Sequence, residues 1–354
     1  MLHLSSIPVM VEFFVFGLFS TRHAMTMRHA KDPETLEFTN ASTFYNEFLV
    51  SILFFSCGLL WPFLYIPTQA SEAGIDLLYN VSSLFILGFS ANWLIQCSYN
   101  YFSCQKNPAE KQQRLEEQAN LLASYRVGAY STAVDIKRKV LHVIPGTVIL
   151  AIQILAIVLN GVPGFYNGVG IDKAAFCIFG EVIVGSNFIF MFQYADLLRL
   201  QSFYQLPPWA KRWFFSSLKK NEMKSFSSAT TLILALFPFV MGPAQILLTL
   251  AFVSSLADAA SSLFGRRFGK HVFPRGSTKT IEGYVAGAVT AFLIAMLFLN
   301  WFNESGFSQV VIILTAIAIA VVVFLIDVTT KTLWDNILNP LLLGAVVVVL
   351  LSVL

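Results

Sequence analysis

Charged residues are scarce in this chain. Asp, Glu, Lys and Arg together make up 12% of its 354 residues, about half of their share in a typical soluble domain. Apolar residues make up 56%, and apolar runs of about 20 residues, long enough to cross a bilayer, recur along the chain. The composition therefore excludes an ordinary soluble protein and predicts one that crosses a membrane several times.

Three kinds of motif are also missing from the sequence. The four cysteines form no CxxC and no Cys/His cluster, so neither a disulfide framework nor a zinc site is indicated. The GxxxxGK[ST] pattern is absent, which argues against a soluble P-loop fold. Residues 1–25 contain neither a basic n-region nor a small-residue cleavage site, so we expect a first membrane segment there and not a removed signal peptide.

The apolar runs predict an all-α, polytopic helical bundle with about ten transmembrane helices. The sixth run is short and ends at Pro238, Gly242 and Pro243, which predicts half of a tight helical hairpin. The predicted spans are 4–20, 44–66, 76–102, 143–161, 175–198, 227–241, 243–264, 283–302, 309–329 and 338–354.

The cations lie almost entirely in alternate connections between these spans. Of the 23 Lys and Arg residues, only Lys173 falls on the opposite side. The positive-inside rule then makes the long connections cytoplasmic and puts both termini outside, which agrees with an even number of spans. The polar segment 106–125 within one long connection favours a solvated surface helix.

The segment 258–282, DAASSLFGRRFGKHVFPRGSTKTIE, gathers five cations, three glycines and two acids at the cytoplasmic end of the seventh span. Asp258 lies inside the apolar run, where an ionisable side chain is costly and indicates function. A carboxylate for a metal, basic side chains and glycines that admit a close ligand suit a nucleotide phosphate. The cations are Arg266, Arg267, Lys270, Arg275 and Lys279, and the glycines are Gly265, Gly269 and Gly276.

Other polar positions allow both a structural and a functional interpretation. Arg138 and His142 at i,i+4 share a helix face suited to a phosphate, yet basic residues there also act as topology anchors. Glu222 and Ser228 begin the sixth span either as a helix cap or as an anion site. Asp196 lies three residues before Arg199, as an internal ion pair or a catalytic acid.

Five blocks of the sequence resemble, in order, motifs of the polyprenol kinase family, which includes dolichol kinase, phytol kinase and the CTP-dependent diacylglycerol kinases. The resemblance covers residues 135–345, and Asp258 begins its best-matching block. The blocks are DIKRKVLHVIPG at 135–146, DLLRL at 196–200, NEMKSFSSATTLIL at 221–234, DAASSLFGRRFGKHVFPRGSTKTIEG at 258–283 and WDNILNPLLLG at 334–344.

The sequence departs from the family pattern at two positions. Ala257 stands where a glycine usually precedes the core Asp, and Trp334 stands where the final block usually has the first of two acids. Asp327 occupies a position where an acid commonly precedes that block. The resemblance gives residues 1–130 no counterpart. We therefore predict an N-terminal membrane extension of about three spans with a polar cytoplasmic helix at 1–130, and a catalytic domain of about seven spans at 131–354.

The resemblance implies a CTP-dependent lipid kinase that transfers the γ-phosphate of CTP to the hydroxyl of a membrane isoprenoid alcohol, with Mg²⁺ or another divalent cation. The acid that takes the proton from the lipid hydroxyl stays open among Asp258, Glu222 and Asp335. The implied catalytic residues are Asp258, Lys279, Glu222 and Asp335, and the implied metal ligands are Asp258, Asp335 and Asp327. The implied nucleotide- and phosphate-binding residues are Arg138, Lys139, His142, Arg199, Ser228, Gly265, Arg266, Arg267, Gly269, Lys270, Thr280, Glu282, Asn336 and Asn339.

Three alternatives remain open. Diacylglycerol is a second acceptor for the same reaction. A CDP-diacylglycerol synthase also uses CTP in a membrane, but its acidic PGHGG ending is missing here. A transporter or lipid-binding scaffold belongs to another class, and the clustering of acids at the predicted cytoplasmic ends argues against it. We expect a multi-pass protein of the cell membrane or the endoplasmic reticulum, with its active site facing the cytoplasm and no nucleic-acid partner.

Overall fold

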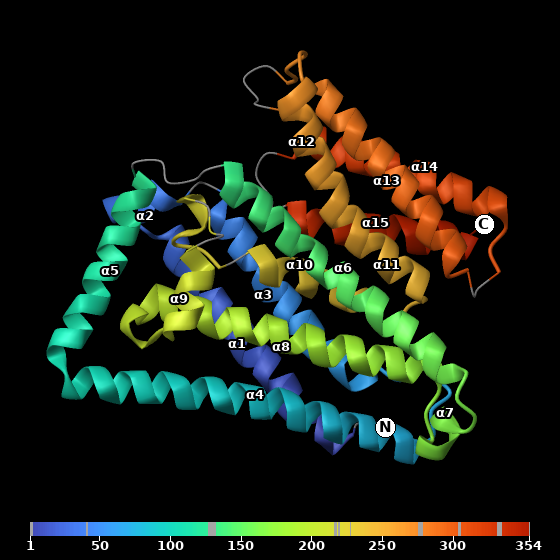
Figure 1. Ribbon diagram of the computed structural model, residues 1–354, viewed down its shortest axis with the longest axis horizontal. Coiled ribbons are helices and arrows are strands. Elements are labelled where there is room, and N and C mark those ends of the chain that lie inside the picture. The colour runs from blue at the N-terminus through green and yellow to red at the C-terminus, as the bar shows by residue number, and fades with distance from the viewer. Residues whose placement is uncertain are drawn as a thin grey trace. The chain divides into compact units, whose positions relative to one another are not determined.

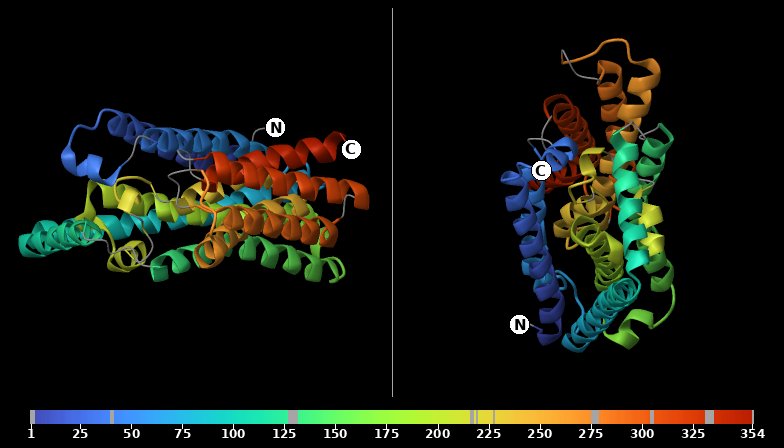
Figure 2. Two further views of the ribbon diagram at one scale, coloured as in Figure 1. Left: turned by 90° about the horizontal axis from the view of Figure 1, so that it is seen from above. Right: turned by 90° about the vertical axis from the view of Figure 1, so that its left-hand side faces the viewer.

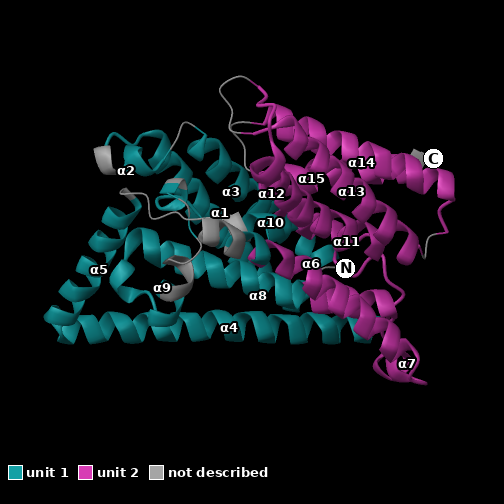
Figure 3. Cartoon of the chain, turned by 45° about the horizontal axis from the view of Figure 1, so that its top comes forward, with its two compact units in different colours: residues 1–63, 72–140, 182–234 teal, residues 64–71, 141–181, 235–354 magenta. Residues whose placement is uncertain are grey.

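A computed structural model describes residues 3–39, 42–126, 132–215, 218, 220–226, 228–274, 279–303, 306–330 and 335–353. Helices make up nearly all of this part of the chain, and the described residues contain no strand, only one isolated bridge between Val272 and Thr280. The predicted all-α class is confirmed (Figure 1). Packing divides the chain into two compact units, each built from segments that are far apart in sequence (Figure 3).

Unit 1 comprises residues 1–63, 72–140 and 182–234. Three helices, α6 (Thr132–Asn160), α8 (Lys173–Gln201) and α10 (Ser228–Leu236), each contribute one part to unit 1 and the other to unit 2. The remaining elements of unit 1 are η1 (Leu4–Ser6), α1 (Ile7–Arg28), α2 (Pro33–Phe38), α3 (Thr43–Leu60), η2 (Trp61–Phe63), α4 (Glu72–Lys106), α5 (Pro108–Arg126), η3 (Phe203–Gln205), α9 (Pro208–Phe215) and η4 (Lys220–Glu222).

Unit 2 comprises residues 64–71, 141–181 and 235–354. The prediction of a boundary at residue 130 rests on where the resemblance begins, and it stays a prediction. The further elements of unit 2 are α7 (Phe165–Val169), η5 (Phe237–Phe239), α11 (Ala244–Phe252), η6 (Val253–Ala257), α12 (Asp258–Phe268), α13 (Ile281–Trp301), α14 (Gln309–Thr329) and α15 (Asp335–Val353).

Nine helices of the described chain are long and apolar enough to cross a membrane, and each coincides with a predicted span. The sixth predicted span differs, because only Thr230–Phe239 forms an apolar helix there. At about 15 Å it is half as long as the hydrocarbon core is thick. The α-helical part ends at Leu236, directly before a 3-10 turn that contains Pro238, and Pro243 is the N-cap of the next helix, α11 (Ala244–Phe252). The protein is thus a multi-pass membrane protein with nine long helices and one short one in the described part.

Small residues allow helices to pack closely in unit 1. α1 and α3 lie side by side (Figure 2). A Cβ at Gly58 on α3 would lie 3.2 Å from the Cβ of Phe13 on α1, and one at Gly17 would meet the ring of Phe55. Within a membrane such contacts matter, because lipid tails are as apolar as leucine and association depends on close packing.

Glycines also allow α12 and α13 of unit 2 to pack closely. A Cβ at Gly283 would lie 2.7 Å from the carbonyl oxygen of Ser261, nearer than real Cβ atoms come. One at Gly287 would lie 3.1 Å from the Cβ of Ser261. Because these positions have no side chain, the first turns of α13 can lie directly against α12. α13 packs in turn on α14, and α14 on α15.

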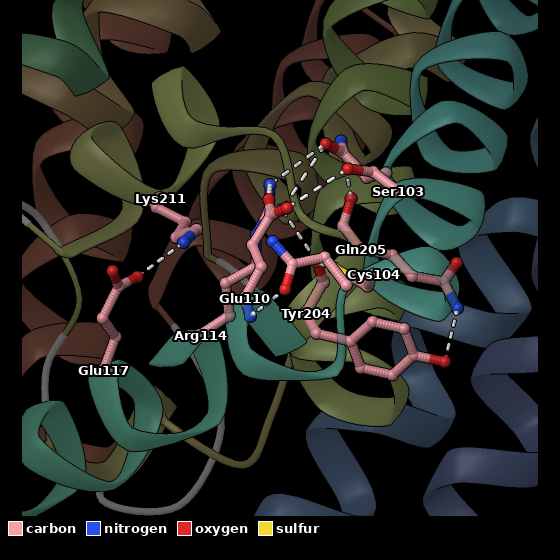
Figure 4. A network of polar contacts seen from close by, with 10 residues as sticks. Ser103, Cys104, Glu110, Arg114, Glu117, Tyr204, Gln205 and Lys211 are labelled. Carbon is pink, nitrogen blue, oxygen red and sulfur yellow. Dashed lines mark hydrogen bonds and ion pairs between the residues drawn. The ribbon is translucent and has the colours of Figure 1, made fainter. Parts of the chain in front are cut away.

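The polar helix predicted at 106–125 is present as α5, and one of its faces is anchored (Figure 4). Arg114 pairs with Glu110 at 2.6 Å and also donates to the carbonyl oxygen of Tyr204 at 2.9 Å. Glu117 accepts from Lys211 of α9 at 2.6 Å. The hydrogen bond from Arg114 lowers the pKa of Glu110. Polar contacts therefore hold α5 to the rest of unit 1, while its other face is exposed.

Candidate acid–lysine site

An acid–lysine cluster, formed by Lys279, Asp258, Asp327 and Asp335, is the main polar feature of unit 2. Lys279 Nζ lies 3.1 Å from Asp327 Oδ1 and donates a hydrogen bond to it, and lies 3.4 Å from the Asp327 carbonyl oxygen. Lys279 precedes α13, whereas Asp327 lies in the last turn of α14. The Asp327 side chain is 9% exposed and that of Lys279 is 40% exposed, so the ammonium remains open to solvent.

The charges of the other two acids, Asp258 and Asp335, also act on Lys279. Burial lowers the pKa of Lys279, but the charges of Asp335, Asp327 and Asp258 outweigh burial and raise it above its ordinary value. Lys279 is therefore protonated at neutral pH. Asp258 begins α12 and Asp335 begins α15, so residues 77 positions apart in sequence act on one ammonium group.

The loop before α13 fixes the backbone of Lys279. The Phe273 amide donates to the Lys279 carbonyl oxygen at 3.2 Å, and the Ile281 amide donates to that of His271 at 2.9 Å. The hydroxyl of Tyr284 donates to the Phe273 carbonyl oxygen at 2.8 Å. The loop therefore consists of two paired arms. Its tip, with the predicted Arg275 and Gly276, falls at 275–278, outside the described residues.

Thr280 and Glu282 have structural roles next to this lysine. Thr280 is buried, and its Oγ1 accepts from the Gly283 amide at 3.3 Å as the N-cap of α13. Glu282 accepts from the His271 ring at 2.6 Å and from the His271 amide at 3.3 Å. Both were predicted to bind nucleotide, and in the structure both hold the loop against the helix.

The two predicted phosphate-binding glycines lie in the contact between α12 and α13. A Cβ at Gly265 would lie 3.2 Å from Thr280 Oγ1 and 3.4 Å from the Gly283 Cα. A Cβ at Gly269 would lie 2.5 Å from Thr280 Oγ1. This is the packing interpretation of these glycines, which leaves little room beside them for a phosphate.

The cations at the end of α12 face outward. Arg266, Arg267 and Lys270 are exposed. Arg266 Nη2 donates to Ser262 Oγ one turn earlier at 2.7 Å, and the Arg267 guanidinium lies 5.5 Å from the ring centre of Phe268. Because all three side chains reach solvent, they can meet an anion there.

The donors of the acid–lysine cluster suit a hard cation, but they do not form a closed cage. Carboxylate oxygens are what Mg²⁺ prefers, and Mg²⁺ usually takes one or two of them together with waters and phosphate oxygens. In the described part of the chain, no three His, Cys, Asp or Glu residues lie close enough together to hold a metal. The predicted ligands Asp258, Asp327 and Asp335 therefore do not form a three-ligand metal site in the structure, and metal binding at this cluster stays a prediction.

The predicted site residues of the other blocks have internal partners in unit 1. Arg138 Nη1 donates to Glu222 Oε1 at 2.8 Å, and both side chains are largely buried. Lys139 is buried as well. Ser228 begins α10, but its side chain lies outside the described part. The pairing of Arg138 with Glu222 explains both residues without a ligand.

Arg199 uses all five N–H donors within unit 1. Nε and Nη2 donate to Asp196 Oδ1 at 3.1 and 2.9 Å. Nη1 donates to the carbonyl oxygens of Glu222 and Met223, and Nη2 also to that of Ser225. Because guanidinium has only five such hydrogens, the predicted phosphate contact would require these bonds to break. The structural alternative for the Asp196–Arg199 pair is the one observed.

Two further residues of this network were absent from the predicted site. Glu47 of α3 is fully buried, and its Oε1 accepts from the Phe226 amide at 2.8 Å. His23 Nε2 lies 3.0 Å from the Lys224 carbonyl oxygen. A carboxyl group inside an apolar run is a signal that the sequence does contain. It marks Glu47 as unusual, but the sequence does not identify the amide that Glu47 binds.

The remaining predicted residues lie in unit 2. His142 is half-buried, and its carbonyl oxygen lies 2.7 Å from Ser255 Oγ. Asn336 follows Asp335 in the first turn of α15, and Asn339 lies one turn further and is buried.

Comparison of the sequence with protein-family models found no match, and comparisons with curated proteins and with solved structures found none either.

Proposed function

We propose that the protein is a CTP-dependent lipid kinase that phosphorylates the hydroxyl of a membrane isoprenoid alcohol. The observation that carries the proposal is the acid–lysine cluster, where three carboxylates act on one partly exposed ammonium group at the ends of membrane helices. The ordered resemblance of residues 135–345 to the polyprenol kinase family suggests the donor and the acceptor. The lack of any match in the comparisons leaves this resemblance as the argument for CTP.

Phosphoryl transfer needs little covalent chemistry from the protein, and it depends mainly on electrostatic stabilisation of the transition state. In this proposal the ammonium of Lys279 neutralises charge on the transferred phosphate. One or two carboxylates of the cluster hold a divalent cation, which supplies further charge neutralisation when bound. The exposed Arg266, Arg267 and Lys270 attract the anionic nucleotide. A second carboxylate of the cluster takes the proton from the lipid hydroxyl.

The residues of unit 1 have a different part in the proposal. Glu222 and Arg199 are internally bonded, so they fix the 222–226 segment and do not perform chemistry. Removing Arg199 would leave Asp196 buried without its cation, which strongly destabilises a fold. Loss of activity in Arg199 variants is therefore expected through folding.

The deciding experiment follows the label of CTP into lipid. Purified protein is given [γ-³²P]CTP or [α-³²P]CTP with a panel of polyprenol, dolichol, phytol and diacylglycerol acceptors. We expect label in lipid from the γ position only, and strongest with an isoprenoid alcohol. Label from the α position alone would replace the kinase by a cytidylyltransferase. Label in diacylglycerol alone would change the acceptor and keep the reaction.

A transporter is the second candidate, because each unit contains a carboxyl group well inside a membrane helix. In unit 1, Glu12 accepts hydrogen bonds from Ser90 and from Tyr194. In unit 2, Glu181 accepts from Gln153 at 2.9 Å. Intramembrane carboxyl groups often belong to ion or substrate paths. Uptake of a labelled solute into proteoliposomes without nucleotide turnover would favour this candidate over the kinase.

A further inference from the structure

The helix that leads to Asp258 is interrupted by a π-helical turn. The span Ala244–Phe268 consists of α11, then η6 at Val253–Ala257, then α12, which begins at Asp258 itself. Such turns are rare and frequently lie at functional sites. Ser255 Oγ in this turn lies 2.7 Å from the carbonyl oxygens of His142 and Ala251 and donates there, which fastens the turn to α6.

Two polar atoms near this turn are buried without a hydrogen-bond partner among the described residues. They are Ser254 Oγ in η6 and Asn339 Oδ1 in α15, on residues that are 3% and 6% exposed. α15 packs against both α11 and η6. Buried polar atoms in natural proteins are nearly always satisfied by protein, water or ligand. This pair therefore indicates something that completes its hydrogen bonds.

Each of these two residues lies one helical turn from an acid of the acid–lysine cluster. Ser254 precedes Asp258 by four residues, and Asn339 follows Asp335 by four residues. Residues four apart share one helix face and are separated by about one turn, 5–6 Å. The charges of Asp258 and Asp335 act on the same ammonium group. The helices thus present a layer of acids and, one turn away, a layer with a hydroxyl and an amide oxygen.

The direction of α12 shows which layer is deeper in the membrane. The helix continues from Asp258 to Phe268 before it reaches its cationic end. Ser254 is therefore farther than Asp258 from that end, and Asn339 is likewise farther than Asp335 from the first residue of α15. A ligand that reaches Ser254 and Asn339 from this side comes from the bilayer. A serine hydroxyl can donate and an amide oxygen can accept, which is what one alcohol hydroxyl needs.

We propose that Ser254 and Asn339 bind the hydroxyl of the acceptor lipid alcohol, which deepens the proposed function and rests on it. The hydroxyl accepts from Ser254 and donates to Asn339 Oδ1. In the reaction its oxygen attacks the γ-phosphorus of CTP, and the bond from that phosphorus to the β,γ-bridging oxygen breaks. CDP leaves with the bond's electron pair, and the hydroxyl gives up its hydrogen bond to Asn339 as its proton passes to a carboxylate of the acid–lysine cluster. The product is a lipid monophosphate.

The test measures binding of a hydroxyl group, not turnover. Full-length protein in nanodiscs is titrated without nucleotide with tritiated geranylgeraniol and, separately, with its methyl ether, which cannot donate a hydrogen bond. The variants are Ser254→Ala and Asn339→Ala. The matched control is Thr315→Val in α14, which removes another fully buried, unpartnered hydroxyl, twelve residues before Asp327. Thermal unfolding is recorded for every protein.

We expect the wild type to bind the alcohol about tenfold more tightly than the ether, since the ether leaves the Asn339 acceptor unpaired. Both site variants lose that preference, and Thr315→Val keeps it. Equal binding of alcohol and ether by the wild type overturns the proposal without any variant, as does an unchanged preference in both variants. If the wild type prefers the alcohol but transfers no phosphate, the hydroxyl-binding site is supported and the proposed kinase activity is contradicted. If it transfers phosphate from CTP but has no preference for the alcohol, the kinase activity is supported and the hydroxyl-binding site is contradicted.

Discussion

Lys279 is the residue on which the proposed chemistry depends most. We expect Lys279→Met to lower γ-phosphate transfer by about 100-fold or more, because removing one preorganised charge from such a site typically costs that much. The rate of label transfer measures this. Lys106→Ala, which removes an exposed cation at the end of α4, is the matched control and should keep wild-type activity. Near-normal transfer by a folded Lys279→Met protein would remove Lys279 from the site.

The same lysine gives the stability of the protein a defined pH dependence. The three acids raise the pKa of Lys279 above its ordinary 10.5. A raised folded-state pKa means that its stabilising contribution is complete below pH 10.5 and is lost as the pH rises through the folded value. We expect the thermal stabilities of wild type and Lys279→Met to differ at neutral pH and to converge above pH 10.5. A difference that stays constant through that range would show that the ion pair contributes nothing.

Single residues also mark the limit of what the sequence could predict. Asp258, Lys279 and Asp327 could be singled out because ionisable groups are rare beside apolar runs, and the structure brings all three together. The internal bonding of Arg199 could not be predicted, because its carbonyl partners at 222–225 lie more than 20 residues away. Backbone carbonyls are present at every residue, so composition does not distinguish the ones that a buried guanidinium will bind.

At the scale of elements, the close contact of α12 with α13 positions the Lys279 loop. We expect Gly283→Ala to destabilise the protein by about 1–3 kcal/mol, as overpacking does, because its Cβ would lie 2.7 Å from the Ser261 carbonyl oxygen. Gly88→Ala in α4 is the matched control, since a Cβ there meets nothing within 4 Å. It should be neutral or stabilising by up to about 1 kcal/mol. Denaturant unfolding in detergent measures both.

The opposite ranking of these two variants would contradict the role given to this contact.

The sequence offered packing and phosphate binding as alternatives for Gly265, and it could not decide between them. The choice depends on which residues face the glycine across the helix pair, here Thr280 and Gly283. Spans were easier to predict, because a 20-residue apolar run has few other ways to satisfy its backbone in lipid. The short sixth helix was signalled by Pro238 and Pro243.

At the scale of the whole molecule, the distribution of charge predicts which ends of the helices face the cytoplasm. Helix ends are fixed by the structure, and sidedness is not, because sidedness depends on the membrane. All Lys and Arg residues except Lys173 fall on the predicted cytoplasmic side. CTP is available in the cytoplasm, so the proposed reaction requires the predicted sidedness to be correct. Two exposed positions on opposite predicted sides, Gln113 in α5 and Gly168 in α7, allow a direct test.

We expect a membrane-impermeant maleimide to label Gly168→Cys in intact cells and Gln113→Cys only after permeabilisation. The native cysteines provide a low background, because Cys57, Cys97, Cys104 and Cys177 are all buried. Gly168 tolerates the change, since a Cβ there meets nothing within 4 Å. Labelling in the reverse order would put the acid–lysine cluster on the side without CTP. The kinase would then lack its donor, while the helices and their packing would be unaffected, so this outcome separates the proposed function from the fold.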